Sequence, residues 1–532
     1  MRSLLKIPVF IILVLCTLCK GYNPYYTFDT FEDQEYWRKI GRDEIEAAIG
    51  RPVNWNIARS VVIFVADGMD PNTVTATRIF KENERGKLSF EKFPHTGLLK
   101  TYSANKKVPD TAASGTALFT GVKTNNGMVG VDATVRLEDC HSSLVPKSRL
   151  GSIMSWAQDA GKYTGFITNK RVTDAVASAL YAHSPSRYWE CNNNVPENSL
   201  CKDIARQLVE DEPGKNFKVI FGGGRQTLID KPYESPQDPL DVFTCYRTDN
   251  RNLINHWIND KNLRSARYSL IKDTGELMEL DTNRNEYVLG LFANSHLPFE
   301  ATRNHSLRGP PSLEIMIEPA LKMLRKNRNG FVLMVEAGLI DLAHHEGHAR
   351  KAVEEAVELD KTVQKTVDLL KELGLYEETL IIVTGGHGHT MSINGYPNRT
   401  ENIFGIADRS KHDDVPYTTL TYATGAKVNF QYYQNGYQVS RDDPAKHDTL
   451  SRNYAQQAAI LTDKETHGGG DVTVYAVGPM AHLFHSIHES TYVAHVIAYA
   501  AKIGPYRTGS AVRIAPTLMI SIVSVFTIFK SI

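Results

Sequence analysis

Three apolar segments, each followed closely by an acidic residue or a histidine, constrain the fold of this chain most strongly. The segments and the residues that follow them are 60–66 with Asp67, 331–335 with Glu336, and 380–384 with His387. Apolar runs rich in β-branched residues and bounded by glycine are typical of strands buried on both faces, which indicates a parallel sheet covered by helices. Further strand candidates are residues 163–168, 217–221 and 472–477.

Segments of helical length separate these predicted strands. The clearest spans residues 349–373, where apolar residues keep near-helical spacing up to Gly374, a good C-terminal cap. The alternation predicts an α/β fold with a doubly wound, mostly parallel central sheet flanked by helices. Residues 391–462 break the pattern with many Asn, Tyr, Gly and Asp residues, and we interpret them as an inserted, loop-rich lobe.

The polar residues after the strands predict the place of a site. Ligands of such sheets bind outside the carboxyl ends of the strands. Asp341 and His345 follow Glu336 there, and His467 precedes the strand predicted at 472–477. Carboxylates and imidazoles are ligands of zinc and magnesium, and two metals can hold both oxygens of an in-line displacement. The pattern indicates a metal-dependent phosphoryl-transfer enzyme or a relative of one.

Charge argues against a nucleic-acid partner. The 532 residues include 60 basic and 60 acidic side chains, so the chain has no overall field that would attract a polyanion.

Both ends of the chain indicate processing. Arg2 and Lys6 precede or flank an apolar stretch that leads to small residues near Gly21, which predicts a signal peptide over 1–21, followed by an N-terminal arm over 22–54. Small residues around Gly509 and Ser510 precede an apolar tail, which predicts a signal for GPI attachment over 508–532. We therefore expect a protein on the extracellular face of the cell membrane.

The cysteines fit an exported chain. Outside the predicted signal peptide they are Cys140, Cys191, Cys201 and Cys245. Four thiols in an oxidising compartment predict two disulfides, with three connectivities open. Asn304 and Asn398 begin Asn-X-Ser/Thr sequences, so we expect glycosylation there.

Over residues 55–507 the chain resembles the alkaline phosphatases. The motifs that carry the resemblance are Asp67-Gly68-Met69, Val108-Pro109-Asp110, Gly121-Val122-Lys123, Tyr181-Ala182-His183, Val335-Glu336-Ala337-Gly338, Ile340-Asp341, Glu465-Thr466-His467 and Ala481-His482-Leu483. The resemblance implies a homodimeric, membrane-anchored hydrolase of phosphate monoesters that uses two zinc ions and one magnesium ion.

The resemblance also implies roles for seven residues. Asp341, His345 and His467 match the ligands of the first zinc, and Arg187 matches the arginine that binds substrate phosphate. Asp67 matches the residue shared by the second zinc and magnesium. Glu336 matches a magnesium ligand, and His387 matches a ligand of the second zinc.

Three positions depart from the family pattern. Thr111 stands where the family has its nucleophilic serine; it keeps a hydroxyl at the start of a predicted helix, where the dipole favours negative charge. Gly386 replaces an aspartate ligand of the second zinc, and Val176 replaces a Ser or Thr of the magnesium site. Only the first zinc site is complete.

Other residues bear on these losses. Asp174 is a candidate to compensate at the magnesium site, and His389 and His344 are each either a substitute ligand or a partner of a ligand. Ala293 and Arg308 fall where animal members have calcium ligands, so we expect no calcium site.

Three functions follow from these departures. The first is a phosphomonoesterase of impaired activity that forms a phosphothreonine at Thr111. The second is an inactive phosphatase relative that serves as a surface-anchored binding protein or receptor. The third is a phosphodiesterase.

Overall fold

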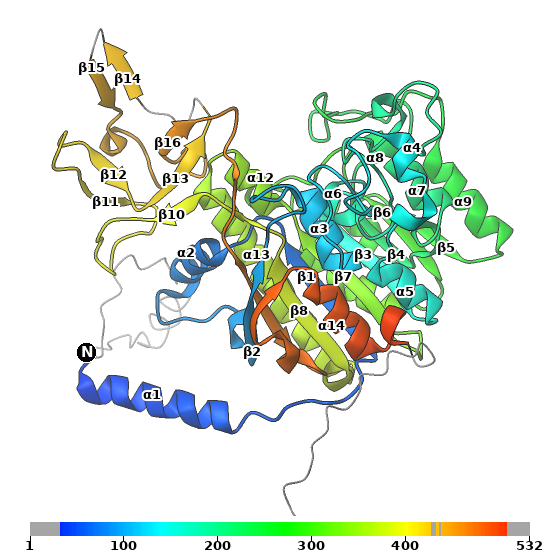
Figure 1. Cartoon of the computed structure of the whole chain (residues 1–532), viewed down its shortest axis with the longest axis horizontal. Coiled ribbons are helices and arrows are strands. Elements are labelled where there is room, and N and C mark those ends of the chain that lie inside the picture. The colour runs from blue at the N-terminus through cyan, green and yellow to red at the C-terminus, as the bar shows by residue number, and fades with distance from the viewer. Residues whose placement is uncertain (1–31, 427–431, 436–437, 508–532) are drawn as a thin grey trace, which may run out of the picture.

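The computed structural model describes residues 32–426, 432–435 and 438–507. The predicted signal peptide and the predicted GPI signal with Gly509 and Ser510 lie outside the described residues. A ten-stranded sheet forms the centre (Figure 1), in the order β19-β2-β18-β8-β1-β7-β3-β4-β6-β5. Its strands are β1 Ser60–Ala66, β2 His95–Lys100, β3 Tyr163–Arg171, β4 Val219–Gly223, β5 Tyr268–Ile271, β6 Tyr287–Leu291, β7 Phe331–Ala337, β8 Thr379–Gly385, β18 Val472–Val477 and β19 Ser486–Glu489.

The sheet is mostly parallel, as the apolar runs predict. Strand β18 runs antiparallel to both of its neighbours, and the other paired strands of this sheet run parallel. Every residue of β1, β7 and β8 is buried. Along β1, Val61 and Ile63 belong to one hydrophobic core, and Val62 and Phe64 belong to the other. The continuous apolar runs therefore reflect strands with a core on each face.

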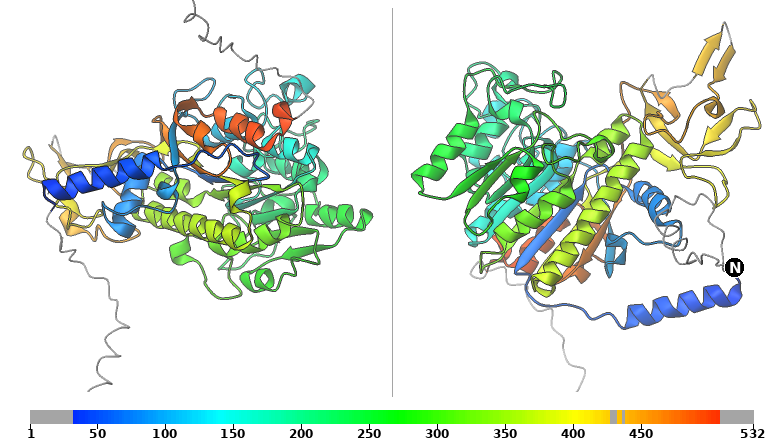
Figure 2. Two further views of the ribbon diagram at one scale, coloured as in Figure 1. Left: turned by 90° about the horizontal axis from the view of Figure 1, so that it is seen from below. Right: turned by 180° about the vertical axis from the view of Figure 1, so that it is seen from behind.

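Helices cover both faces of the sheet (Figure 2). The α-helices of the described residues are α1 Gln34–Ile49, α2 Pro71–Glu82, α3 Thr111–Thr120, α4 Cys140–Ser143, α5 Ile153–Asp159, α6 Ala175–Ser178, α7 Ile204–Glu210, α8 Arg225–Leu228, α9 Leu253–Leu263, α10 Thr274–Met278, α11 Leu313–Leu324, α12 Leu339–His345, α13 Ala349–Glu372 and α14 Tyr492–Ala501. Helix α1 has no buried residue and lies apart from the sheet (Figure 1). Helices α3, α5, α7 and α14 contribute to one core, and α11 and α13 to the other. The α/β prediction is confirmed.

The described residues between 391 and 461 form small sheets apart from the central one (yellow to orange in Figure 1). Strands β10 Met391–Ile393, β13 Leu420–Gly425 and β16 Ala458–Leu461 form one; β11 Ile406–Arg409 pairs with β12 Pro416–Thr418, and β14 Tyr432–Asn435 with β15 Gln438–Arg441. Phe404 and Tyr422 pack in a separate core with Val353 of α13. Hydrophobic packing thus joins this lobe to the main body.

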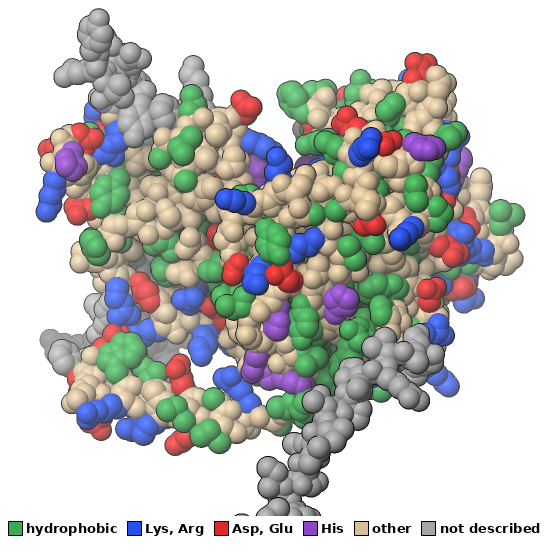
Figure 3. Space-filling model, viewed as in Figure 1, with side chains coloured by type: hydrophobic (Ala, Val, Ile, Leu, Met, Phe, Trp, Pro, Cys, Tyr) green, Lys and Arg blue, Asp and Glu red, His purple; other side chains and the backbone are tan. Residues whose placement is uncertain are grey.

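Two disulfides join Cys140 to Cys201 and Cys191 to Cys245, which selects one of the three connectivities. The acceptor residues Asn304 and Asn398 are both exposed. Basic and acidic side chains are interspersed on the face shown in Figure 3. Within the described ranges, no helix has both the length and the apolar character needed to cross a bilayer.

Candidate metal and phosphate site

Four neighbouring parallel strands place charged side chains at one edge of the sheet. The strands are neighbours in the order β3, β7, β1 and β8. Strand β3 carries Lys170 and β7 carries Glu336 near its carboxyl end, whereas Asp67 follows β1 and His387 follows β8. All four side chains are buried. The site therefore lies at the edge where parallel sheets bind ligands.

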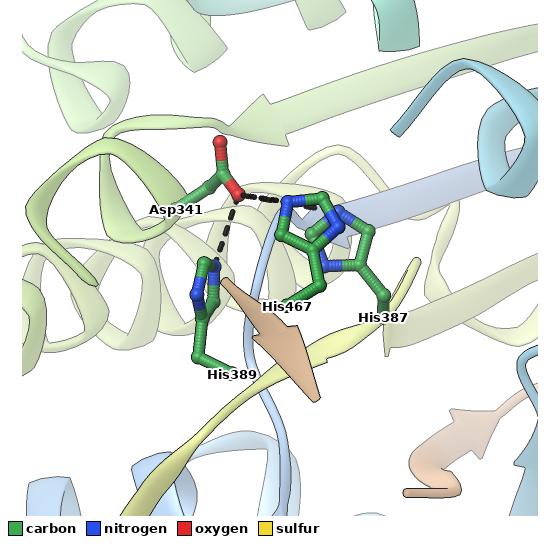
Figure 4. A group of neighbouring side chains, drawn as sticks. All are labelled: Asp341, His387, His389 and His467. Atoms are coloured by element: carbon green, nitrogen blue, oxygen red, sulfur yellow. Dashed lines mark hydrogen bonds and ion pairs between the residues drawn. The ribbon is translucent and has the colours of Figure 1, made fainter. Parts of the chain in front are cut away.

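Helix α12 adds an acid and a base one turn apart. Asp341 and His345 are separated by four residues, which puts them on the same side of the helix. The Oδ1 atom of Asp341 lies 3.4 Å from His345 Nε2 and 3.3 Å from His467 Nε2. Asp341 and the histidines at 387, 389 and 467 face one another in Figure 4.

The histidine rings are oriented through their far nitrogens. His345 Nδ1 lies 2.6 Å from the carbonyl oxygen of Glu465, and His467 Nδ1 lies 2.8 Å from that of Pro109. Carbonyl oxygens only accept hydrogen bonds, so Nδ1 carries the proton in each neutral ring and Nε2 is a bare acceptor. The two Nε2 atoms are 3.1 Å apart. Acceptors that converge in this way with a carboxylate fit a zinc ion.

Protonation bears on this fit. Burial lowers the pKa of His345 to about 3, so this ring is neutral and available as a ligand at ordinary pH. Burial also lowers the pKa of His389, to about 4. Burial acts in the same direction on His467, but Asp341 outweighs it and raises the pKa of that ring. A positive charge is thus favoured beside Asp341.

His389 joins this cluster, whereas His344 does not. Strand β9 Gly388–His389 pairs with β17 His467–Gly468, which sets His389 opposite His467. Its Nε2 lies 3.0 Å from Asp341 Oδ1, and its Nδ1 lies 2.5 Å from Glu465 Oε2. Both ring nitrogens of His344 are engaged elsewhere, by Tyr422 and by a threonine hydroxyl. His389 is therefore placed as a fourth candidate ligand.

Thr111 begins helix α3. The side chain of the N-cap residue Asp110 accepts a hydrogen bond from the Ala113 amide, which fixes the start of the helix. Thr111 is 1% exposed, and its Oγ1 lies 3.2 Å from His387 Nε2. Arg187 Nη1 lies 3.2 Å from Asp110 Oδ2. A hydroxyl, a helix N-terminus and a guanidinium group thus meet where a phosphate could bind.

The second zinc position keeps only part of its donors. Asp67 Oδ1 lies 3.1 Å from His387 Nε2, but the contact lacks hydrogen-bond geometry and leaves this buried oxygen without a donor. Gly386 supplies no ligand, and a Cβ atom there would lie 2.8 Å from Ser114 Oγ. Asp67, His387 and Thr111 could hold a cation, with one carboxylate fewer than the family pattern.

The magnesium position contains a lysine that the sequence analysis missed. Lys170 Nζ lies 2.7 Å from Asp67 Oδ2 and 2.9 Å from Asp341 Oδ2. Burial lowers the pKa of Lys170, but Asp341 and Asp67 outweigh it and raise the pKa well above its usual value. The remaining carboxyl, Glu336, has its pKa raised to about 8 by burial despite the nearby ammonium. Magnesium does not fit beside this ammonium group.

The candidate compensating residue is occupied elsewhere. Asp174 accepts hydrogen bonds from Arg171 Nη2 at 3.0 Å and from the Ala175 amide at 2.8 Å. Val176 is buried in α6, next to Gly115 of α3. Asp174 therefore serves the arginines and the start of α6 rather than the carboxylates of the site.

The two positions associated with calcium line one cavity. Ala293 and Arg308 both border this cavity, which has a volume of about 1110 Å³. One side chain has no oxygen and the other is a cation, so neither can serve as a calcium ligand.

The fold and the cluster define an α/β protein with a candidate metal centre at the carboxyl ends of its strands. The alkaline phosphatase family profile matches residues 58–503, so the chain belongs to the alkaline phosphatase family. It is 40% identical over 506 residues to the tissue-nonspecific isozyme of Gallus gallus, covering 91% of this chain and 93% of that protein. It is 36% identical over 488 residues to the membrane-bound alkaline phosphatase of Bombyx mori, covering 90% and 86%. The alkaline phosphatase structure from Thermus thermophilus has a similar fold, with a TM-score of 0.59 at 21% identity over 85% of this chain and 93% of that one.

Proposed function

We propose that this chain hydrolyses phosphate monoesters at the cell surface through a phosphothreonine at Thr111, more slowly than relatives with a complete metal site. The observation that carries the proposal is the position of Thr111 Oγ1, at the start of α3 and 3.2 Å from His387 Nε2. A GPI anchor, a homodimer and glycosylation at Asn304 and Asn398 are part of the proposal. The membrane-bound relative from Bombyx mori supports the location.

Each side chain has a task in this reaction. Arg187 binds two oxygens of the phosphate, and the N-terminus of α3 favours its negative charge. Thr111 Oγ1 attacks the phosphorus while its proton passes to His387 Nε2, and His387 then gives that proton to the ester oxygen, which leaves as an alcohol. Water then attacks the phosphothreonine, which releases phosphate and restores the hydroxyl. Zinc bound by Asp341, His345 and His467 would keep an open position, supply a Lewis acid and lower the pKa of that water, while His389 hydrogen-bonds Asp341.

Two features support a reduced rate. Gly386 removes a carboxylate from the residues around Thr111, so a second cation would be held by fewer ligands. The methyl group of threonine also restricts its χ1 rotation, which limits how the hydroxyl can adjust during attack.

A second function has its own observation. Lys170 pairs with two carboxylates of the site, Asp67 and Asp341. A phosphatase relative with such a site could bind phosphate at Arg187 without turnover and act as a surface-anchored binding protein.

The test compares hydrolysis of an aryl phosphate at alkaline pH by the wild-type protein, Thr111→Val and Thr111→Ser, all in zinc. Thr111→Val removes the hydroxyl with little change of shape, so we expect at least about a 1000-fold loss of kcat. Thr111→Ser keeps the nucleophile and should keep the activity or raise it. Equal rates for the wild type and Thr111→Val would reject the enzyme and leave the binding protein.

A further inference from the structure

A buried lysine lies among the carboxylates of the site. The side chain of Lys170 is 4% exposed, and those of Asp67 and Asp341 are 0% and 7% exposed. Its ammonium group contacts one oxygen of each carboxylate within 3 Å, at 2.7 and 2.9 Å. Charged hydrogen bonds of this length in a buried setting hold the ammonium between the two acids.

The surrounding chain is shaped around this lysine. A Cβ atom at Gly338 would lie 2.7 Å from both Cγ and Cδ of Lys170, so a larger residue there would collide with the lysine stem. Thr168 Oγ1 accepts a hydrogen bond from the Lys170 amide at 2.8 Å and donates one to Glu336 Oε2 at 2.7 Å. The backbone of the lysine and the third carboxyl of the site are thus held by one hydroxyl.

The same position cannot also hold magnesium. Magnesium requires about six oxygen ligands at about 2.0–2.1 Å in near-octahedral geometry. The Oδ2 atom of Asp67 is already bound by the ammonium, Val176 has no oxygen in its side chain, and Asp174 is engaged by Arg171. A magnesium ion would have to displace a buried cation that is already paired.

We propose that Lys170 is a tethered cation that replaces the third metal, so that this chain binds zinc and has no magnesium site. A consequence follows for Asp341, whose Oδ2 faces the lysine while its Oδ1 faces the histidines. Zinc at the histidine cluster would therefore be held by a single oxygen of this carboxylate. The proposal holds whether the protein turns over phosphate esters or only binds them.

The experiment measures Mn²⁺, a paramagnetic substitute for magnesium, by the loss of its free EPR signal in titrations of zinc-saturated, full-length protein. We expect no bound equivalent for the wild type. The variant Lys170→Thr/Val176→Thr exchanges the ammonium and a methyl group for hydroxyls, so we expect one bound equivalent with an affinity at least about tenfold above the wild type. One equivalent bound by the wild type would overturn the proposal, as would a folded double variant that binds none.

A matched control uses a lysine just before the same strand. Lys162 donates from Nζ to the backbone carbonyls of Arg59 and Asn329, away from the carboxylates. Lys170→Met should lower Tm by leaving buried acids unpaired and make Tm rise on addition of Mg²⁺, whereas Lys162→Met should show no response to Mg²⁺. No response in Lys170→Met would count against the proposal. If the double variant does not fold, the wild-type Mn²⁺ titration decides the question by itself.

Discussion

The two oxygens of the Asp341 carboxylate differ in the groups that contact them. On the Oδ1 side, His345, His389 and His467 present ring nitrogens that converge on a carboxylate oxygen. On the Oδ2 side, Lys170 supplies an ammonium from within the chain. The first side presents the donor set of a metal ion, and the second already carries a cation of the chain itself. One carboxylate thus divides the site into a histidine half and a lysine half with different needs for metal.

Under the proposal for Lys170, metal dependence is lost in one half of the site and kept in the other. In the histidine half, ring nitrogens and a carboxylate oxygen converge, and such a set of donors fits a bound ion. In the lysine half, the ammonium of Lys170 already pairs with one oxygen of Asp67 and one of Asp341. A family member can therefore lose one metal position and keep another a few ångströms away.

The largest expected effect is loss of zinc from the histidine half. His345→Ala removes a candidate ligand, and we expect zinc affinity to fall by about 100-fold or more, measured by competition with a chromogenic chelator. The adjacent His344→Gln serves as the control, because both ring nitrogens of His344 are engaged by Tyr422 and Thr73 and its ring only stacks on His389. Equal zinc affinity in the two variants would remove the basis for placing zinc on the histidine side.

A smaller effect is expected at the second zinc position, which is formed by Asp67, His387 and Thr111. Gly386→Asp would return the missing carboxylate, but its Cβ would meet Ser114 Oγ at 2.8 Å. We therefore combine it with Ser114→Ala, which removes that oxygen. We expect zinc content measured by mass spectrometry to rise from one to two equivalents, with a higher phosphatase rate.

Ser114→Ala alone is the control for this gain and should stay at one zinc. A double variant that gains neither zinc nor activity would show that Gly386 does not limit the second position.

The smallest effect concerns a buried carboxyl behind the lysine half. Glu355 on α13 accepts a hydrogen bond from Asn169, whose own side chain accepts one from the Gly338 amide. Burial raises the pKa of Glu355 to about 8 from its ordinary value of 4.5. The folded protein therefore holds this proton at pH values where the unfolded chain has released it. The contribution of Glu355 to the free energy of unfolding is therefore fully present below pH 4.5 and is lost as pH rises through 8.

Thermal unfolding between pH 6 and pH 9 tests this pKa. The Tm of the wild type should fall over this range. The Tm of Glu355→Gln, which cannot titrate at this position, should fall less, and the two falls should differ by about 2 °C or more. Glu354→Gln is the control, because this neighbouring carboxylate pairs with Arg350 and Arg452. An unchanged slope in Glu355→Gln would contradict the raised pKa.

Several features could be predicted from the sequence, because they depend on local pattern. The strand predicted at 472–477 matches β18, and the helix predicted at 349–373 matches α13 to within one residue. The strand predicted at 217–221 begins at Val219 instead, because Phe217 ends a short 3₁₀ turn. Such shifts are the usual limit of pattern reasoning at the ends of elements.

Lys170 shows how one boundary hid a site residue. The strand predicted at 163–168 continues to Arg171, so three further polar residues, Asn169, Lys170 and Arg171, are inside the buried end of β3. A lysine after a strand ordinarily reaches solvent, so its sequence position gave no sign that it pairs with Asp67 and Asp341. The one signal in the sequence for such a pairing was the position of this lysine, close to the end of a predicted buried strand.

By itself, the sequence determined the α/β class, the family and the residues that could hold the first zinc, because each depends on residue type and on spacing along the chain. Only the tertiary structure decided which charged and polar residues pair with one another. It brought Lys170 to Asp67 and Asp341, set His389 beside the candidate zinc ligand Asp341, engaged both ring nitrogens of His344 elsewhere, and paired Asp174 with Arg171. Electrostatic pairing acts over a few ångströms in space, and Lys170, which is 103 and 171 positions from its two partners, meets them at that distance only after the sheet has formed.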